Sequence, residues 1–85
     1  MTLDKQRVLA ECIEAEYLPT ETSWRESKNN AFLLARHRGL PVMLIFGERP
    51  PWFEGDTISV GEVYALKCPL TSGNLLALQQ KFPEL

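Results

Sequence analysis

The segment from Ser23 to Gly39 has the most complete helical pattern in the chain. Ser23 and Glu26 stand at the spacing of a capping box, in which each side chain bonds the backbone N–H of the other residue. Basic residues precede Gly39, where they suit the negative end of a helix dipole, and glycine often closes a helix in the left-handed conformation. The apolar residues at or near helical spacing are Trp24, Ala31, Phe32, Leu33, Leu34 and Ala35. These signals predict a helix from Trp24 to Arg38.

Val42 to Phe46 is a continuous apolar run between Pro41 and Gly47. The run is too short for a typical helix and contains β-branched residues, so it predicts a strand that is buried on both faces. Such a strand needs other parts of the fold, or another molecule, to cover each side of it.

Another helix is predicted at the start of the chain. Thr2 can cap it and Asp4 lies in its first turn, while Leu18 and Pro19 end it because the residue before a proline disfavours the helical conformation. Its apolar face comprises Val8, Leu9, Cys12, Ile13 and Tyr17. Residues 19–22 leave only a short connection to the next helix, so the two helices are expected to pack as a hairpin.

Residues 58–70 allow two interpretations. Apolar residues of one parity favour a half-buried strand with a bulge at Gly61 and Glu62. These apolar residues are Ile58, Val60, Tyr64, Leu66, Cys68 and Leu70. A helix capped at Ser59 is the alternative, because Glu62 completes a capping box there. The glycine and the β-branched residues favour the strand.

A last helix is predicted at the end of the chain. Thr71 or Ser72 can cap it, and Pro83 ends it. Its apolar residues are Leu75, Leu76, Leu78 and Phe82. The chain is therefore expected to be a single small α+β domain over residues 1–85, with the element order α-α-β-β-α. In this arrangement a helical hairpin and a C-terminal helix pack on a short antiparallel β-hairpin.

Part of the chain resembles the first helix and the central strand of thioredoxin-like proteins. The resemblance rests on Trp24 to Glu26, on Ala31 and Ala35, and on the run from Gly39 to Phe46, about a quarter of the chain. It implies an aromatic-led helix that leads into a central strand. No Cys-x-x-Cys redox motif follows the strand, and Pro51 to Phe53 stand in its place, so the redox activity of that family is not expected here.

Composition and charge narrow the classes of protein to consider. The content of 45% hydrophobic and 24% charged residues is ordinary for a folded soluble protein. The net charge of −2 lacks the excess of Lys and Arg that marks a nonspecific nucleic-acid binder, and it is too small for a DNA mimic. Cys12 and Cys68 stand far apart and are expected to be reduced, buried thiols. The polar N-terminus has no signal-peptide core and no run reaches the ~20 residues of a membrane span, so we expect a cytoplasmic protein without membrane contact.

No catalytic, cofactor or metal site is predicted, and we expect the protein not to be an enzyme. His37 is the only histidine, and it stands between two arginines at a predicted helix end, where it is typically a solvated partner of the helix dipole. Cys12 and Cys68 occupy apolar faces, where a thiol behaves as a small hydrophobe. The chain has no Cys-x-x-Cys, no histidine pair, no acidic calcium loop and no glycine cluster that could cradle a phosphate.

We expect a non-enzymatic protein-interaction module of the adaptor, regulator or inhibitor type that forms a homodimer. Two strands alone make a marginal sheet, and Val42–Phe46 would expose an apolar edge that invites pairing with a second copy. The loop that follows combines rigid prolines with large aromatics, which suit a partner protein or fold back over the core as a lid. The candidate partner-binding residues are Arg49, Pro50, Pro51, Trp52 and Phe53.

The alternative is a small nucleic-acid-binding regulator. Its candidate residues lie on the predicted helix that ends before Gly39, and they are Arg25, Lys28, Arg36, His37 and Arg38. A solvated helix face accounts for the same residues, and nearby glutamates dilute their charge. A helix-turn-helix over residues 59–82 is a further alternative, although its second helix would offer few basic groups beside a leucine-rich face.

Overall fold

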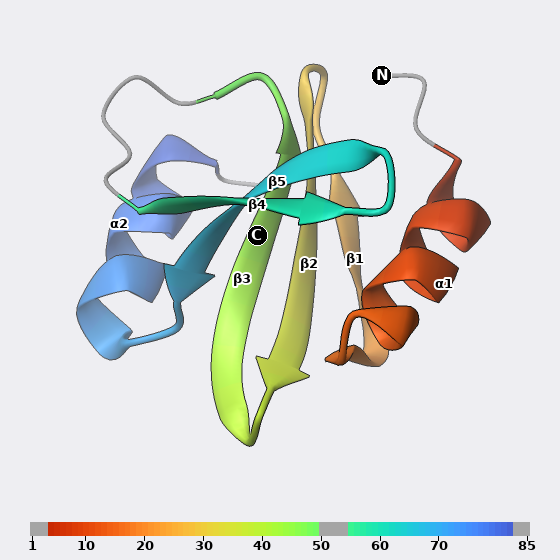
Figure 1. Cartoon of the computed structure of the whole chain (residues 1–85). Helices are drawn as coiled ribbons and strands as arrows, with labels where there is room; N and C mark the ends of the chain where they lie inside the picture. Colours follow the sequence, from red (N-terminus) through yellow and green to blue (C-terminus); the bar gives the residue numbers. More distant parts are fainter. Residues whose placement is uncertain (1–3, 50–54, 83–85) are drawn as a thin grey trace.

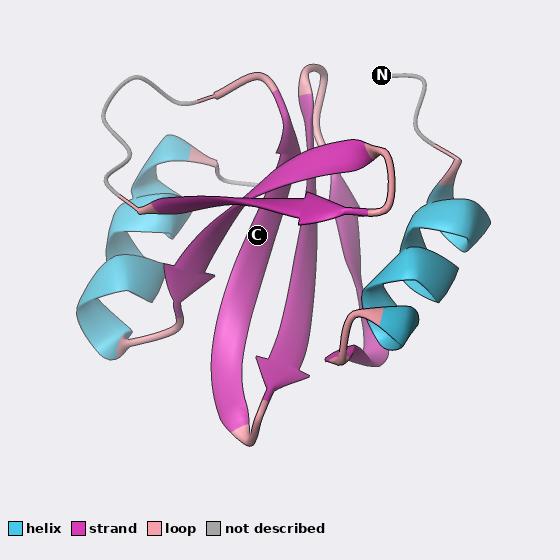
Figure 2. Ribbon diagram, viewed as in Figure 1, coloured by secondary structure: helices cyan, strands magenta, loops and turns pink. Residues whose placement is uncertain are grey.

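The computed structural model describes residues 4–49 and 55–82, apart from the side chains of residues 21–23, and this part of the chain forms two helices and five strands (Figures 1 and 2). The strands form one antiparallel sheet in the order β1-β2-β3-β5-β4. The elements are α1 (Lys5–Glu14), β1 (Tyr17–Glu26), β2 (Asn30–His37), β3 (Leu40–Gly47), β4 (Asp56–Val60), β5 (Val63–Pro69) and α2 (Ser72–Lys81). The order is helix, sheet, helix, so the predicted order α-α-β-β-α is wrong.

The predicted helix from Trp24 to Arg38 is replaced by the end of β1, a turn and all of β2. The backbone of Ser23 lies within β1 and therefore caps no helix, and Trp24 pairs with Leu33 across the ladder. Residues 31–35 are all apolar because their side chains alternate between two covered faces of the sheet. A run that is apolar at every position shows no period, so it cannot distinguish a strand from a helix.

Gly39 closes a β-hairpin and not a helix. Arg38 and Gly39 have φ angles of 55° and 81°, and they join His37 to its partner Leu40 as a two-residue turn. Positive φ at both central residues is the requirement of a type I′ turn, whose twist matches that of the flanking strands. The left-handed glycine was expected correctly, but helix ends and hairpin turns both demand it.

The predicted N-terminal helix is confirmed over Lys5–Glu14, and it ends earlier than expected. Asp4 is its N-cap, with the carboxylate accepting from the backbone N–H of Arg7 at 3.3 Å. At its end, Glu16 adopts the left-handed conformation at φ 68°, and Tyr17 begins β1. Because β1 follows at once, the predicted helical hairpin is wrong. The predicted cap at Thr2 lies outside the described residues.

The preference for strand over helix in residues 58–70 is confirmed, although the segment is a hairpin and not one strand. Gly61, at φ 62°, and Glu62 form the turn between β4 and β5, where a bulge was expected. The turn changes the parity of the buried positions: Ile58 pairs with Ala65 on one face, whereas Leu66 faces the other side of the sheet. The same strands exclude the helix-turn-helix, whose first helix would have occupied them.

The predicted C-terminal helix is confirmed as α2, with Thr71 as its N-cap accepting from the backbone N–H of Asn74 at 3.2 Å. Only Leu78 of this helix is buried among the described residues. Phe82 follows the helix, and its ring lies 4.6 Å from that of Phe32. Neither helix of the described chain is long and apolar enough to cross a membrane.

The strand prediction for Val42–Phe46 is confirmed, and β3 is the central strand of the sheet. Its five apolar residues are between 0% and 3% exposed, and β3 pairs with β2 on one side and β5 on the other. The edges of the sheet are β1 and β4. The strand is therefore enclosed by its own chain, and the expectation that it needs a second copy to cover it is wrong.

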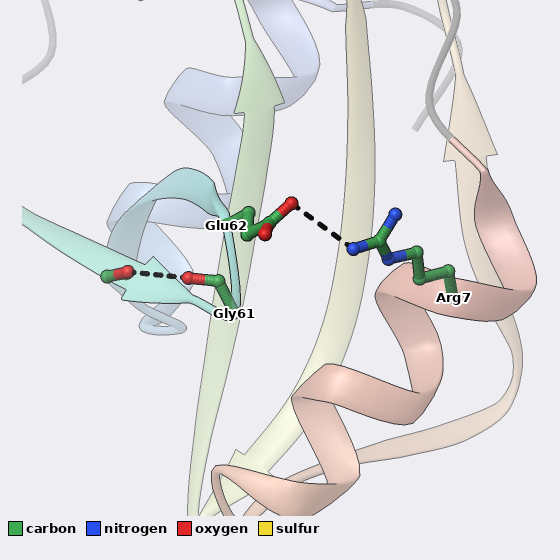
Figure 3. Close-up of polar contacts among 4 residues, drawn as sticks. Arg7, Gly61 and Glu62 are labelled. Carbon is green, nitrogen blue, oxygen red and sulfur yellow. Dashed lines mark hydrogen bonds and ion pairs between the residues drawn. The ribbon is translucent and has the colours of Figure 1, made fainter.

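Two clusters of buried residues occupy the two faces of the sheet, which we call the α1 face and the α2 face. The α1 face includes Val8, Cys12, Leu33, Leu44 and Phe46, and the α2 face includes Phe32, Met43, Ile45, Leu66 and Leu78. Figure 1 shows α1 and α2 on opposite sides of a strongly twisted sheet. Helix α1 contacts both edge strands, and Arg7 forms an ion pair of 3.2 Å with Glu62 in the β4–β5 turn (Figure 3).

The resemblance to thioredoxin-like proteins is not upheld by the fold. Its proposed helix is part of an antiparallel strand pair, and the run from Gly39 to Phe46 pairs with antiparallel neighbours on both sides. The shared residues are apolar core positions that two different folds use.

Candidate functional site

An open pocket lies on the α1 face, at the end of the sheet that carries the Arg38–Gly39 turn. We call it the turn-end pocket, and its volume is about 470 Å³. It is formed by the end of β2, the β2–β3 turn, the start of β3, the first residue of β4, the end of β5 and the connection to α2. Its lining residues are His37, Arg38, Leu40, Pro41, Val42, Asp56, Lys67, Pro69, Leu70 and Thr71.

The floor of the turn-end pocket is apolar. Val42 is buried and pairs with Pro69, and the backbone N–H of Leu70 donates to the carbonyl of Pro41 at 3.1 Å. These contacts hold the ends of β3 and β5 together beneath the pocket. Leu40 stands at the rim with 68% of its surface exposed, so the apolar lining extends to the solvent.

A lysine, a histidine and a tyrosine form a stacked group beside this floor. The Nζ of Lys67 lies 3.3 Å from the Nδ1 of His37 and 5.7 Å from the centre of the Tyr17 ring. The rings of Tyr17 and His37 stack with their centres 4.1 Å apart. Strand pairing explains the grouping, because β2 and β5 flank β3 and present His37 and Lys67 on the same face.

The protonation of His37 suits this arrangement. Desolvation lowers the pKa of His37 below its ordinary value of 6.5, and the positive charges of Lys67 and Arg38 lower it further, against an opposite effect of Glu16. The imidazole is therefore neutral at neutral pH. A neutral Nδ1 without hydrogen can accept a hydrogen bond from the Lys67 ammonium group, which a protonated ring could not do.

The pocket is locally cationic within an acidic chain. Arg38 and Lys67 contribute +2 and Asp56 contributes −1, so the lining carries +1 with His37 neutral, against −2 for the whole chain. Asp56 is the register partner of Lys67, yet in the part of the chain that the structure describes no ion pair joins it to Lys67 or Arg38.

The basic residues proposed for nucleic-acid binding do not share one surface. Strand pairing puts Arg25 and Arg36 on the α2 face of the β1–β2 hairpin, whereas His37 is on the α1 face. Lys28 and Arg38 occupy the turns at the two ends of β2. The strand has eight residues that rise ~3.3 Å each, so the two turns lie on the order of 25 Å apart. Only His37 and Arg38 of this set belong to the turn-end pocket.

Most of the proposed partner-binding loop lies outside the described residues, namely Pro50, Pro51, Trp52 and Phe53. Arg49 is described and exposed, and its Nη1 donates to the hydroxyl of Thr57 at 3.0 Å. The residues that sequence reasoning missed are chiefly Leu40, Asp56 and Lys67. A charged residue between buried neighbours in a strand was the available signal for Lys67.

Both cysteines are free and buried, as predicted. Burial, with a smaller effect of Glu11, raises the pKa of the Cys12 thiol to about 11, and burial also raises the pKa of Cys68. The thiols are therefore protonated at neutral pH and poor nucleophiles. Within residues 4–49 and 55–82, no group of three or more His, Cys, Asp or Glu side chains is placed to hold a metal ion.

Comparisons with protein-family models, with curated proteins and with solved structures give no significant match. The function of the chain is therefore inferred from the geometry of the turn-end pocket.

Proposed function

We propose that the chain is a non-enzymatic protein-interaction module that binds a partner protein through the turn-end pocket. The observation that carries the proposal is Leu40, which stands exposed over an apolar floor and beside two cations. Apolar surface that continues from a pocket to an exposed rim is typical of binding sites, and arginine at such a rim is common in protein interfaces.

The same geometry indicates what the pocket accepts. Its volume lies within the roughly 300–1,000 Å³ range of sites that bury a compact ligand. The central strand β3 is already buried from Val42 to Phe46 within its own chain, so the exposed leucine is not required to complete the core. A side chain of a partner that enters the pocket would remove the exposed apolar surface of Leu40 and Pro69 from water.

The proposal does not include self-association. The homodimer was expected because Val42–Phe46 needed cover, and those residues are buried within one chain. It also does not extend to nucleic acid, because the five basic residues named for that function are spread over two faces and two turns.

Selection of peptides from a random display library against the folded protein tests the proposal. We expect Leu40→Gln to weaken the binding of selected peptides by roughly tenfold to a hundredfold, the worth of one buried leucine side chain. Leu76→Gln is the matched control, because Leu76 is an exposed leucine on α2 that is not among the residues lining the pocket. Peptides that bind both variants equally well would contradict the proposal.

A further inference from the structure

We infer that the partner segment received by the turn-end pocket is a linear peptide in which an apolar side chain stands next to an aspartate or glutamate. This inference rests on the proposed function and adds the chemistry of the partner. The apolar side chain would cover the floor formed by Val42 and Pro69, and the carboxylate would meet Lys67 and Arg38 at the side of the pocket.

Lys67 is restrained in a way that suits a carboxylate. Its ammonium group has three N–H donors, and one of them is directed to the Nδ1 of His37 at 3.3 Å. The face of the Tyr17 ring lies 5.7 Å from the same nitrogen and further stabilises the cation there. The remaining donors can bond a carboxylate oxygen, and a cation held in advance loses less side-chain entropy when the ligand binds.

The residues that line the pocket carry a net positive charge, and Glu16 lies near His37 outside that lining. Arg38 contributes a positive charge from the β2–β3 turn and Asp56 a negative charge from β4, while Glu16 lies on the α1–β1 connection and acts on His37. With Lys67 included, the lining carries +1. An acidic peptide is therefore attracted to this end of the sheet.

A peptide fits the observations better than a nucleic acid. A phosphate backbone is recognised by several cations that follow its repeat, and here Arg25 and Arg36 lie on the opposite face from the pocket. The floor is formed by aliphatic and proline side chains, and the aromatic ring in the lining, His37, already stacks on Tyr17 with its centre 4.1 Å away. Shared burial of apolar side chains is the contact that such a floor offers to a peptide.

The test uses a peptide chosen from the display selection for its dependence on Leu40, and a second peptide in which each aspartate or glutamate is replaced by its amide. Binding of both to the folded protein is measured by fluorescence anisotropy. We expect the acidic peptide to bind about tenfold to a hundredfold more tightly than the amide form, the range for hydrogen bonds to charged groups. Lys67→Met should remove most of this preference and leave the binding of the amide form within about twofold.

Two further variants keep the test interpretable. Lys81→Met removes a lysine from the last turn of α2 and should preserve the preference, because Lys81 is not part of the pocket. Lys67→Arg retains the cation and should also preserve the preference, which separates loss of charge from loss of fold.

Three results would overturn the inference. They are equal binding of the acidic and amide peptides, an equal loss of both in Lys67→Met, and displacement of the acidic peptide by short single-stranded RNA or duplex DNA. Equal binding that still depends on Leu40 would leave the proposed protein-interaction function standing. If no selected peptide depends on Leu40, the proposed function and this inference fail together.

Discussion

The two halves of the α1 face are built from the same strands and have opposite roles. Along β3, Leu44 and Phe46 are fully buried in the cluster beneath α1, whereas Leu40, on the same side of the strand, is exposed at the turn-end pocket. Along β5, Ala65 is buried and Lys67 lines the pocket. Side chains alternate between the two faces of the sheet in the same way in both halves. The extent of the region that α1 covers therefore determines which positions on the α1 face are core and which are surface.

The end of α1 sets the boundary between these halves. The left-handed Glu16 stops the helix and turns the chain into β1, and Tyr17 then stacks on His37 at the margin of the covered region. Beyond Tyr17 the face carries His37 and Lys67. No helix covers this part of the face, so its charged and polar side chains remain hydrated and avoid the cost of desolvation.

The largest expected effect is the difference in the free energy of unfolding between a variant in the covered half of the α1 face and one in the open half. Phe46→Ala removes a fully buried ring beneath α1 and should lower the free energy of unfolding by about 3–5 kcal/mol. Leu40→Ala should change it by less than about 0.5 kcal/mol, because an exposed residue leaves no cavity. Urea denaturation followed by circular dichroism measures both values. Equal losses in the two variants would show that the halves are not distinct.

A smaller effect tests the turn that forms the rim of the pocket. Gly39 has φ 81°, and a Cβ added there would meet no neighbouring atom within 4 Å, so Gly39→Ala should cost about 1–2 kcal/mol through backbone conformation alone. Gly73 has equal space but lies inside α2, where Gly73→Ala should stabilise the protein by about 0.5–1 kcal/mol. The same denaturation experiment applies, and effects of equal sign would contradict the assigned turn.

The smallest effect concerns the protonation of His37. Its pKa is lowered in the folded protein, so the unfolded chain binds more protons as the pH falls below about 6.5. The contribution of His37 to stability is therefore complete above that pH and is lost as the pH falls through the lowered pKa. Between about pH 8 and about pH 5.5, the urea midpoint should fall more in the native protein than in His37→Gln. Equal decreases of the urea midpoint in the native protein and in His37→Gln would show that protonation of His37 does not affect stability.

The elements that sequence reasoning identified correctly are those with local signals. Thr71 caps α2, and the apolar run Val42–Phe46 forms a strand. The error over Trp24–Arg38 had two physical causes. A strand covered on both faces has no hydrophobic period in residues 31–35, and a left-handed glycine at position 39 serves hairpins as well as helices.

The candidate site was less predictable than the fold, because it depends on strand order. Lys67 meets His37 only because β5 and β2 both pair with β3, and Asp56 joins them through its register with β5. Neither pairing leaves a signal in residues that are close in the sequence. His37 and Arg38 were named as candidate site residues, but on a helix face that does not exist.

The most direct test of the account is the place at which a Leu40-dependent acidic peptide binds. Backbone amide chemical shifts of the isotope-labelled protein can be followed during titration with that peptide. The largest changes are expected over residues 37–42 and 67–71, with little change over Lys5–Glu14 of α1. Changes centred on α1 or α2, with those two segments unaltered, would contradict a binding site in the turn-end pocket.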